Sequence, residues 1–190
     1  HNNIGQLLGE RGQFEAAMAR YDQALSLRPT MASVRNNRAI TLLLTGDFAA
    51  GWPEYEWRWK MPDAPQRPWP QPEWDGSPLE GRTILLYPEQ GLGDTLQFVR
   101  YAPLVKARGG NVIVLAPKKM APILSTCAGI DRLISPQDQP PHFDVRAALL
   151  SLPGTLQTRL ESIPADVPYL SAELDLVVHW RKALGGDERL

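Results

Sequence analysis

The sequence has a single cysteine and only three histidines, and this shortage limits the chemistry it can support. Cys127 alone cannot form an internal disulfide or supply a cysteine-ligated zinc site. His1, His142 and His179 lie far apart, and no metal-ligand spacing joins them. We therefore expect neither a metal nor a cofactor. The lone thiol favours a reducing, cytoplasmic setting.

Long apolar runs and an excess of one charge are missing as well. No apolar segment approaches the roughly 20 residues that cross a bilayer, and no signal peptide is visible. The net charge is −1, which gives no electrostatic argument for binding nucleic acid or an anionic membrane surface. The hydrophobic fraction of 43% instead predicts a globular protein with a substantial core.

Several nucleotide-binding and hydrolytic motifs are absent. The chain contains neither the Gly-Lys-Ser/Thr sequence of a phosphate-binding loop nor the Gly-x-Ser-x-Gly elbow of hydrolases. Gly91-Leu92-Gly93 begins like a dinucleotide-binding turn, but Leu96 occupies the position of the third glycine. No acidic residue follows the predicted strand that ends at Leu115. The sequence thus argues against a dinucleotide site of this type.

What the chain does contain begins with a repeat over residues 1–60. Residues 34 positions apart match, and the first copy also has Gly5, Ala17, Ala24 and Pro29 at motif spacings. This period and pattern resemble the tetratricopeptide repeat, a helical hairpin whose small residues let two helices approach closely. We expect helices near 2–11, 15–27, 31–44 and 49–60. The matched pairs are Asn2-Asn3 with Asn36-Asn37, Gly12 with Gly46, Phe14 with Phe48, and Tyr21 with Tyr55.

Tryptophan and proline are concentrated after the repeats. Five of the six tryptophans fall between Trp52 and Trp74, and six prolines fall between Pro62 and Pro78. Because proline excludes helix and central strand, we expect residues 61–80 to form an irregular connector. The tryptophans could make a sugar-stacking platform, but we favour a plug between the repeats and the following domain, since each ring buries a large area.

From residue 81 the pattern changes to strands that alternate with helices. Short apolar runs predict strands at 83–87, 111–115, 132–134 and 143–146, and helical patterns cover 94–107, 118–127 and 172–184. Residues 149–160 are helical or irregular, with Pro153 as a breaker. The predicted fold class is therefore α/β with an all-α lead-in, in which a Rossmann-like parallel sheet follows the helical repeats. Such sheets bind ligands at the carboxyl ends of their strands.

Several blocks of the sequence together resemble a known family. They are Trp57-Arg58-Trp59, Trp74-Asp75-Gly76, Glu89-Gln90-Gly91-Leu92-Gly93-Asp94, Leu150-Ser151-Leu152-Pro153 and Pro168-Tyr169-Leu170. The chain resembles bacterial tetratricopeptide-repeat proteins with a glycosyltransferase-like domain related to the heptosyltransferases. The resemblance implies a GT-B architecture, in which two Rossmann-like halves face each other across a cleft.

The resemblance also implies a division of the chain. Residues 1–60 would be the repeats, 61–80 the connector, and 81–171 the N-terminal, acceptor-side Rossmann-like half. Residues 172–190 would be a connecting helix toward a second half that these 190 residues do not include. The nucleotide sugar and the acceptor would then be bound only together with that half. The implied activity is an inverting transfer from a nucleotide sugar, and this chain alone would be inactive.

The same resemblance nominates a site around Asp94. This carboxylate would be the general base that takes a proton from the acceptor hydroxyl. Gly91 and Gly93 would let substrates approach the backbone closely. Glu89, Gln90, Gln97 and Arg100 are additional substrate-binding candidates. No metal ligand is implied.

Several alternatives remain open. Asp94 followed by Gln97 also has the spacing of a capping box, which would make the aspartate an N-cap. Arg100 could contact a phosphate or a surface acid. The repeats could offer a groove for a protein or peptide, or serve only as a packing module. The whole chain could thus be a non-catalytic interaction module built from repeats and a degenerate transferase-like domain.

Overall fold

The structure, a computed structural model, describes residues 1–65 and 69–185. Residues 66–68 of the predicted connector and 186–190 of the last predicted segment lie outside this part. The chain divides into two compact units. The helical unit contains His1–Trp69 and Pro153–Ile163, and the sheet unit contains Pro70–Leu152 and the residues from Pro164 onward.

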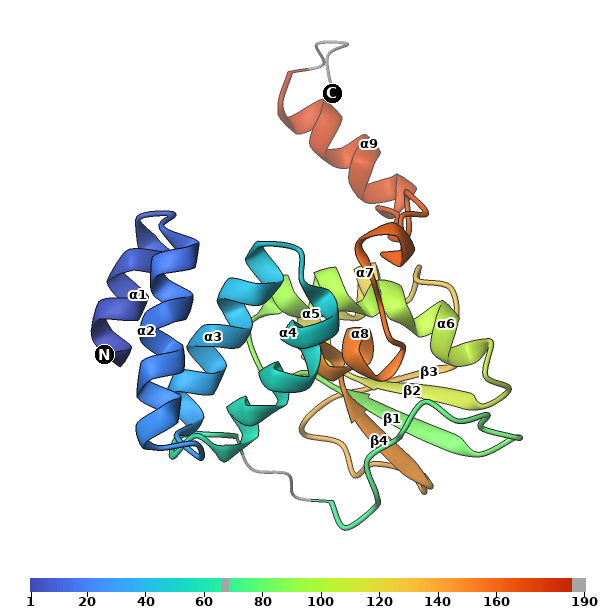
Figure 1. Ribbon diagram of the computed structural model, residues 1–190. Coiled ribbons are helices and arrows are strands. Elements are labelled where there is room, and N and C mark those ends of the chain that lie inside the picture. Colours follow the sequence, from blue (N-terminus) through green and yellow to red (C-terminus); the bar gives the residue numbers. More distant parts are fainter. Residues whose placement is uncertain (66–68, 186–190) are drawn as a thin grey trace. The chain divides into compact units, whose positions relative to one another are not determined.

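The helical unit begins with two helical hairpins (Figure 1). The helices α1 (Asn2–Glu10), α2 (Phe14–Leu27) and α3 (Ala32–Leu44) agree within about a residue with the predicted ones. Gly12 and Gly46 lie in the two hairpin turns with φ of 73° and 86°. Glycine adopts such positive φ values without the steric cost that a side chain brings, so the repeated glycines fix both turns.

The last predicted helix of the repeats, 49–60, is interrupted. It consists of α4 (Phe48–Tyr55) and a 3₁₀ helix, η1 (Glu56–Lys60). The Asp47 carboxylate accepts a hydrogen bond from Ala50 N at 3.1 Å and so caps the start of α4. Pro53 lies inside α4, where its missing N–H leaves only the carbonyl four residues earlier without an intrahelical bond, and the chain continues as 3₁₀ helix after Tyr55.

Close approach of α1 and α2 depends on Gly5. Tyr21 is 2% exposed, and it packs with Ala17, Ala24, Leu25 and Val34 in the core of the helical unit. A Cβ atom at Gly5 would lie 2.5 Å from Cε1 of Tyr21, well inside van der Waals contact. The small residue that the repeat motif requires is therefore needed to accommodate the tyrosine ring.

The segment after the sheet returns to the helical unit. It includes part of α8 (Leu152–Thr155) and the 3₁₀ helix η5 (Leu160–Ser162). A Cβ atom at Gly154 would lie 3.1 Å from Cβ of Trp52, so this segment packs closely on α4. Two cations lie close to the ring of Trp57, with Arg35 Cζ at 4.3 Å and Lys60 Nζ at 3.7 Å from its centroid. The tryptophan plug between domains remains a prediction.

The sheet unit is built on four parallel strands in the order β3-β2-β1-β4 (Figure 1). The strands are β1 (Thr83–Tyr87), β2 (Asn111–Leu115), β3 (Arg132–Ile134) and β4 (Val145–Ala148). The first three match the prediction, and the predicted α/β fold class is confirmed. The fourth begins two residues later than predicted because the Asp144 carboxylate accepts Thr83 N at 2.7 Å, ahead of the ladder.

The predicted helix 94–107 consists of three consecutive pieces, α5 (Leu92–Phe98), the 3₁₀ helix η2 (Val99–Tyr101) and α6 (Ala102–Lys106). Pro103 lies in the first turn of α6, where its missing N–H is tolerated, whereas a continuous helix would need that donor. The remaining helical elements are η3 (Lys118–Met120), α7 (Ala121–Leu124), η4 (Leu149–Ser151) and α9 (Leu174–Ala183).

Part of the proline-rich segment covers one edge of the sheet. Trp74 N donates to the Arg146 carbonyl at 2.7 Å, and Arg146 N donates to the Pro72 carbonyl at 3.0 Å. These bonds place Glu73 alongside β4 in a short parallel bridge. The edge of β4 is thereby paired, which removes a row of exposed backbone groups that could otherwise recruit another strand.

Within the described residues, no helix has the length and apolar character needed to cross a membrane.

The Gly5–Tyr21 contact predicts opposite effects for two glycines of the same helix. Gly5→Ala should destabilise the helical unit by about 1–2 kcal/mol, because overpacking outweighs the gain in helix propensity. Gly9→Ala is the matched control, since its Cβ would meet Thr41 Oγ1 at an ordinary 3.8 Å, and it should stabilise by up to about 1 kcal/mol. Urea unfolding followed by circular dichroism measures both, and stabilisation by Gly5→Ala would contradict the packing argument.

The single thiol provides a probe of the sheet unit. Cys127 is 4% exposed, and burial raises its pKa. We therefore expect the native chain to react with a thiol reagent at pH 8 at least about tenfold more slowly than the urea-unfolded chain, because the reactive thiolate is scarce and covered. Ser125→Cys adds an exposed thiol two residues away and should label rapidly. Equal labelling rates at the two positions would show that Cys127 is accessible.

Candidate functional site

The candidate site lies where the order of the strands reverses in the sheet unit. The chain runs from β1 outward through β2 to β3 and then returns to place β4 on the other side of β1. Tyr87 pairs with Ala148 in the parallel register, so the loops that follow β1 and β4 leave the sheet side by side. Such a switch point is where open parallel sheets form a ligand crevice.

Glu89 joins these two loops. Its Oε2 atom accepts a hydrogen bond from Leu150 N at 3.4 Å, at the start of η4. The residue is half-buried, whereas its neighbour Gln90 is exposed. Glu89 therefore helps to hold these two loops together, and Gln90 is the more exposed of the two predicted substrate-binding residues.

Asp94 is not the N-cap of its helix, which corrects one of the two sequence alternatives. The N-cap of α5 is Gly91, and Asp94 stands three residues later in the first turn. The Asp94 Oδ2 atom accepts from Gly91 N at 3.0 Å, so its carboxylate reaches back to the N-cap backbone. The capping-box spacing led us to place Asp94 at the N-cap, whereas it is the third residue of the helix. The true N-cap is a glycine, which has no side chain that would mark it in the sequence.

Gln97 does not bond the backbone of the helix N-cap, as the capping-box alternative predicted. The Gly91 amide is bonded by Asp94, and Gln97 lies further along α5 with an exposed side chain. Its backbone carbonyl accepts from Arg100 Nε at 2.9 Å. Gln97 thus lies on the surface of α5, on the same helix as Asp94.

The backbone conformation at Gly91 and Gly93 does not require glycine. Gly91 has φ of −70°, which any residue can adopt. Neither Gly91 nor Gly93 has a positive φ, and a Cβ atom at Gly93 would meet nothing within 4 Å. Both are exposed. Glycine at these positions therefore leaves exposed backbone at this end of the sheet, the arrangement that close approach of a ligand requires.

Arg100 is held by neighbouring groups of the sheet unit rather than by a surface acid. Its guanidinium lies 4.5 Å from the ring centroid of Tyr169, and Nη2 donates to the Tyr169 hydroxyl at 3.0 Å. Nη1 donates to the Pro164 carbonyl at 3.3 Å. The Tyr169 hydroxyl in turn donates to the Leu96 carbonyl at 3.1 Å. These contacts give Arg100 a structural task, which is to tie residues 164–169 to the helix that carries Asp94.

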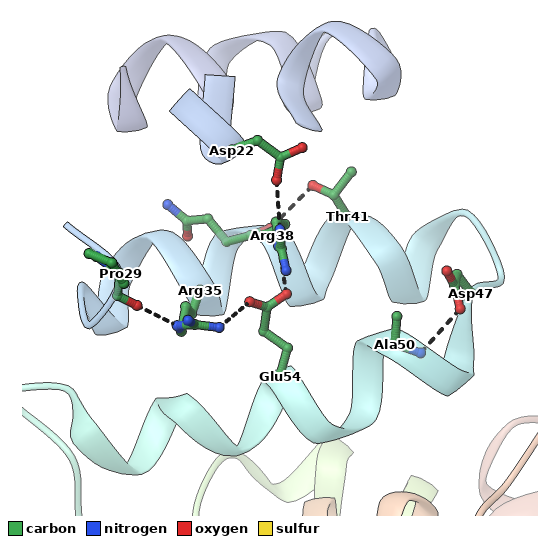
Figure 2. Close-up of polar contacts among 9 residues, drawn as sticks. Asp22, Pro29, Arg35, Arg38, Thr41, Asp47, Ala50 and Glu54 are labelled. Carbon is green, nitrogen blue, oxygen red and sulfur yellow. Dashed lines mark hydrogen bonds and ion pairs between the residues drawn. The ribbon is translucent and has the colours of Figure 1, made fainter. Parts of the chain in front are cut away.

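Sequence reasoning missed a polar network in the helical unit (Figure 2). The Glu54 carboxylate is 6% exposed and accepts from Arg38 Nε at 2.7 Å and from Arg35 Nη1 at 3.2 Å. Arg38 Nη1 donates to Asp22 Oδ1 at 2.6 Å, so this one side chain joins α2, α3 and α4. Burial alone would lower the pKa of Arg38, but the bonds to Glu54 and Asp22 outweigh it and raise the pKa. The arginine therefore stays charged at any working pH.

No periodic signal in the sequence could have identified this network. The residues 34 positions before Arg38 and Glu54 are Ile4 and Arg20, which cannot form the same ion pair.

An open hollow of about 660 Å³ also lies in this unit, along α2 and beside the two hairpin turns. Phe14 and Met18 contribute its apolar lining, and Glu15 and Asp22 its charged lining. Among the described residues, no cluster of three or more possible ligands could hold a metal ion.

The geometry around Asp94 predicts a modest structural role that can be measured separately from any chemistry. Asp94→Ala should cost about 1 kcal/mol of stability, since it removes the bond to Gly91 N and a favourable charge in the first turn. Asp94→Asn should cost less, because an amide oxygen can still accept. Gln97→Ala should have almost no effect. Chemical unfolding of the three variants tests this, and an equal loss for Gln97→Ala and Asp94→Ala would restore the original capping box.

Comparison with known proteins supports the repeat. Residues 5–46 match the family model described as TPR repeat, so the predicted tetratricopeptide repeat is confirmed for this part of the chain. The chain is also 28% identical over 196 residues to Protein FlbA of Caulobacter vibrioides, an alignment that covers 91% of this chain and 33% of FlbA. The chain therefore spans about a third of the length of this relative. It contains a tetratricopeptide repeat joined to a parallel α/β unit, and its repeat is of a type that serves protein interaction.

Proposed function

We propose that the sheet unit is the acceptor-side half of a repeat-fused glycosyltransferase that inverts the sugar configuration. The observation that carries the proposal is the position of residues 89–94, which form the end of the loop after β1 and the first turn of α5, at the switch point of the sheet. Open glycine backbone and a half-exposed carboxylate meet there. The block of residues that resembles transferases thus coincides with the place where this fold class binds ligands.

In this mechanism Asp94 acts as a general base. One carboxylate oxygen, Oδ2, is committed to Gly91 N. The other oxygen would take the proton of an acceptor hydroxyl while the hydroxyl oxygen forms a bond to the anomeric carbon. The bond from that carbon to the nucleotide breaks on the opposite face, so the nucleoside diphosphate leaves with the bonding electrons. The bond to Gly91 N orients the carboxylate toward its proposed task, and a second half would exclude water from the reaction.

The proposal includes a division of labour. The nucleotide sugar would be held mainly by a second Rossmann-like half, and the repeats would hold a polypeptide. Gly91 and Gly93 would line the acceptor path, with Glu89, Gln90 and Gln97 around it. Arg100 would support the site through Tyr169. A cytoplasmic location, suggested by the single reduced thiol, is part of the same proposal.

A second candidate function is a non-catalytic interaction module. The match of residues 5–46 to the tetratricopeptide repeat favours it, as does the hollow beside α2. Under this hypothesis the Asp94 carboxylate has only the structural task of holding Gly91 N. The two candidates differ in what they require of Asp94, and one substitution therefore separates them.

The experiment uses Asp94→Asn in a polypeptide that carries this chain followed by a second, nucleotide-binding half. Loss of a general base should reduce transfer by a factor of about 10² or more, while the unfolding midpoint stays close to that of the parent. Gln97→Ala is the control and should retain most of the activity. Undiminished transfer by Asp94→Asn would exclude the assigned base. For the present chain alone, calorimetry with a panel of nucleotide sugars should show no binding, and tight binding would overturn the proposed division.

A further inference from the structure

The helix that carries Asp94 is too short to hold its own position. α5 has seven residues, Leu92–Phe98, and isolated helices shorter than about 12 residues are marginal in water. Its first turn is fixed at Gly91, where the Asp94 carboxylate accepts from the amide and the Thr95 hydroxyl donates to the carbonyl at 3.2 Å. Thr95 is also buried, which anchors one side of the helix. The position of α5 therefore depends on what holds its other end.

Two side chains bond backbone carbonyls at the C-terminal end of α5. The last four carbonyl groups of an α-helix lack partners within the helix. In α5 the Gln97 carbonyl accepts from Arg100 Nε at 2.9 Å, and the Leu96 carbonyl accepts from the Tyr169 hydroxyl at 3.1 Å. Arg100 is close to α5 in the sequence, whereas Tyr169 lies 73 positions after Leu96. Tyr169 thus ties this end of the helix to a distant segment of the sheet unit.

The Tyr169 hydroxyl is itself held in place. It accepts from Arg100 Nη2 at 3.0 Å while it donates to the Leu96 carbonyl. The guanidinium also lies over the tyrosine ring, and its Nη1 donates to the Pro164 carbonyl. A tyrosine hydroxyl can donate and accept at the same time, whereas phenylalanine would offer the ring alone. The hydroxyl is therefore the group that joins the arginine to the helix.

The segment that carries Tyr169 has a second tie, which does not involve α5. Ser171 N donates to Thr126 Oγ1 at 2.9 Å, and Thr126 lies two residues after the end of α7. The segment contains neither helix nor strand between η5 and α9, so these two ties are separate polar contacts along one irregular stretch. Substitutions at Tyr169 and at Thr126 can therefore release them one at a time.

We infer that Tyr169 is a positioning residue for Asp94. Its hydroxyl fixes the C-terminal end of α5, and the hydrogen bonds within this short helix carry that constraint to the carboxylate in the first turn. Tyr169 acts only through α5 and touches no substrate in this role. The inference rests on the general-base function proposed for Asp94, for which a displacement of about 1 Å can cost about 10²-fold in rate.

The first test uses the full chain and the Gly91 amide as a reporter, because this amide is bonded by Asp94. In Tyr169→Phe, which keeps the ring, NMR should show the Gly91 amide exchanging with solvent about fivefold faster, the effect of one lost hydrogen bond. Thr126→Ala is the matched control, since it releases Ser171 from the same segment and should leave the exchange of Gly91 unchanged. Unchanged exchange in β1 would show that both variants keep the sheet.

A double substitution tests whether Tyr169 acts through Asp94. Asp94→Ala alone should expose the Gly91 amide, and adding Tyr169→Phe should then change its exchange by less than about twofold. The inference is overturned if Gly91 exchanges at the same rate in Tyr169→Phe and in the parent chain. It is also overturned if Thr126→Ala accelerates Gly91 as much as Tyr169→Phe does, or if the effects of Asp94→Ala and Tyr169→Phe simply multiply.

The second readout is transfer by the polypeptide that also carries a nucleotide-binding half, measured as release of nucleoside diphosphate from the panel of nucleotide sugars. Tyr169→Phe should lower kcat about tenfold and leave KM nearly unchanged, because a misplaced base slows the chemical step rather than binding. Thr126→Ala should keep both constants. If Asp94→Asn retains full transfer, the general base and this inference fail together. If Asp94→Asn loses transfer and Tyr169→Phe does not, only the positioning role of Tyr169 fails.

Discussion

Pairing of β1 on both of its edges is the constraint on which the sheet unit depends. The strand pairs in parallel with β2 on one side and β4 on the other, and Ile84, Leu85 and Leu86 are fully buried. The strand therefore has partners on both edges, and the N–H of Thr83 at its start is bonded by the Asp144 carboxylate. The same pairing creates the switch point, because only a strand flanked on both sides can send its loop between two diverging connections.

The helical unit depends on two other interactions, the close packing of α1 on α2 and the ion pairs of a buried acid. Gly5 lets the Tyr21 ring fill the space between α1 and α2. The buried Glu54 carboxylate is stabilised by Arg35 and Arg38, and Arg38 also reaches Asp22. A buried acid without these partners would be strongly destabilising, whereas with them it fixes the relative positions of three helices. Sterics thus set the first hairpin, and ion pairing joins it to the second.

The structural bond of Asp94 is compatible with the general-base role that we propose for it. Its bond to Gly91 N closes the first turn of α5 and fixes where the side chain points. A general base gains from such orientation, because proton transfer requires a defined geometry. Arg100 and Tyr169 stabilise the same helix from the residue 164–169 side. The proposed base is therefore held by contacts that do not themselves involve a substrate.

The sequence by itself determined most of the element types, since the turn glycines and the apolar strand runs are signals that act over a few residues, and the 34-residue period marks the repeated helical hairpins. It therefore predicted the bounds of β1, β2 and β3, and those of α1, α2 and α3 within about a residue, whereas the fourth strand was placed two residues too early. Tertiary structure alone decided the strand order, the bond of Glu89 to Leu150 N, the clamp on Arg100 and the Asp22–Arg38–Glu54 network. These features join residues 16 to 69 positions apart. Such pairings arise from packing and charge in three dimensions, where no sequence spacing specifies the partner.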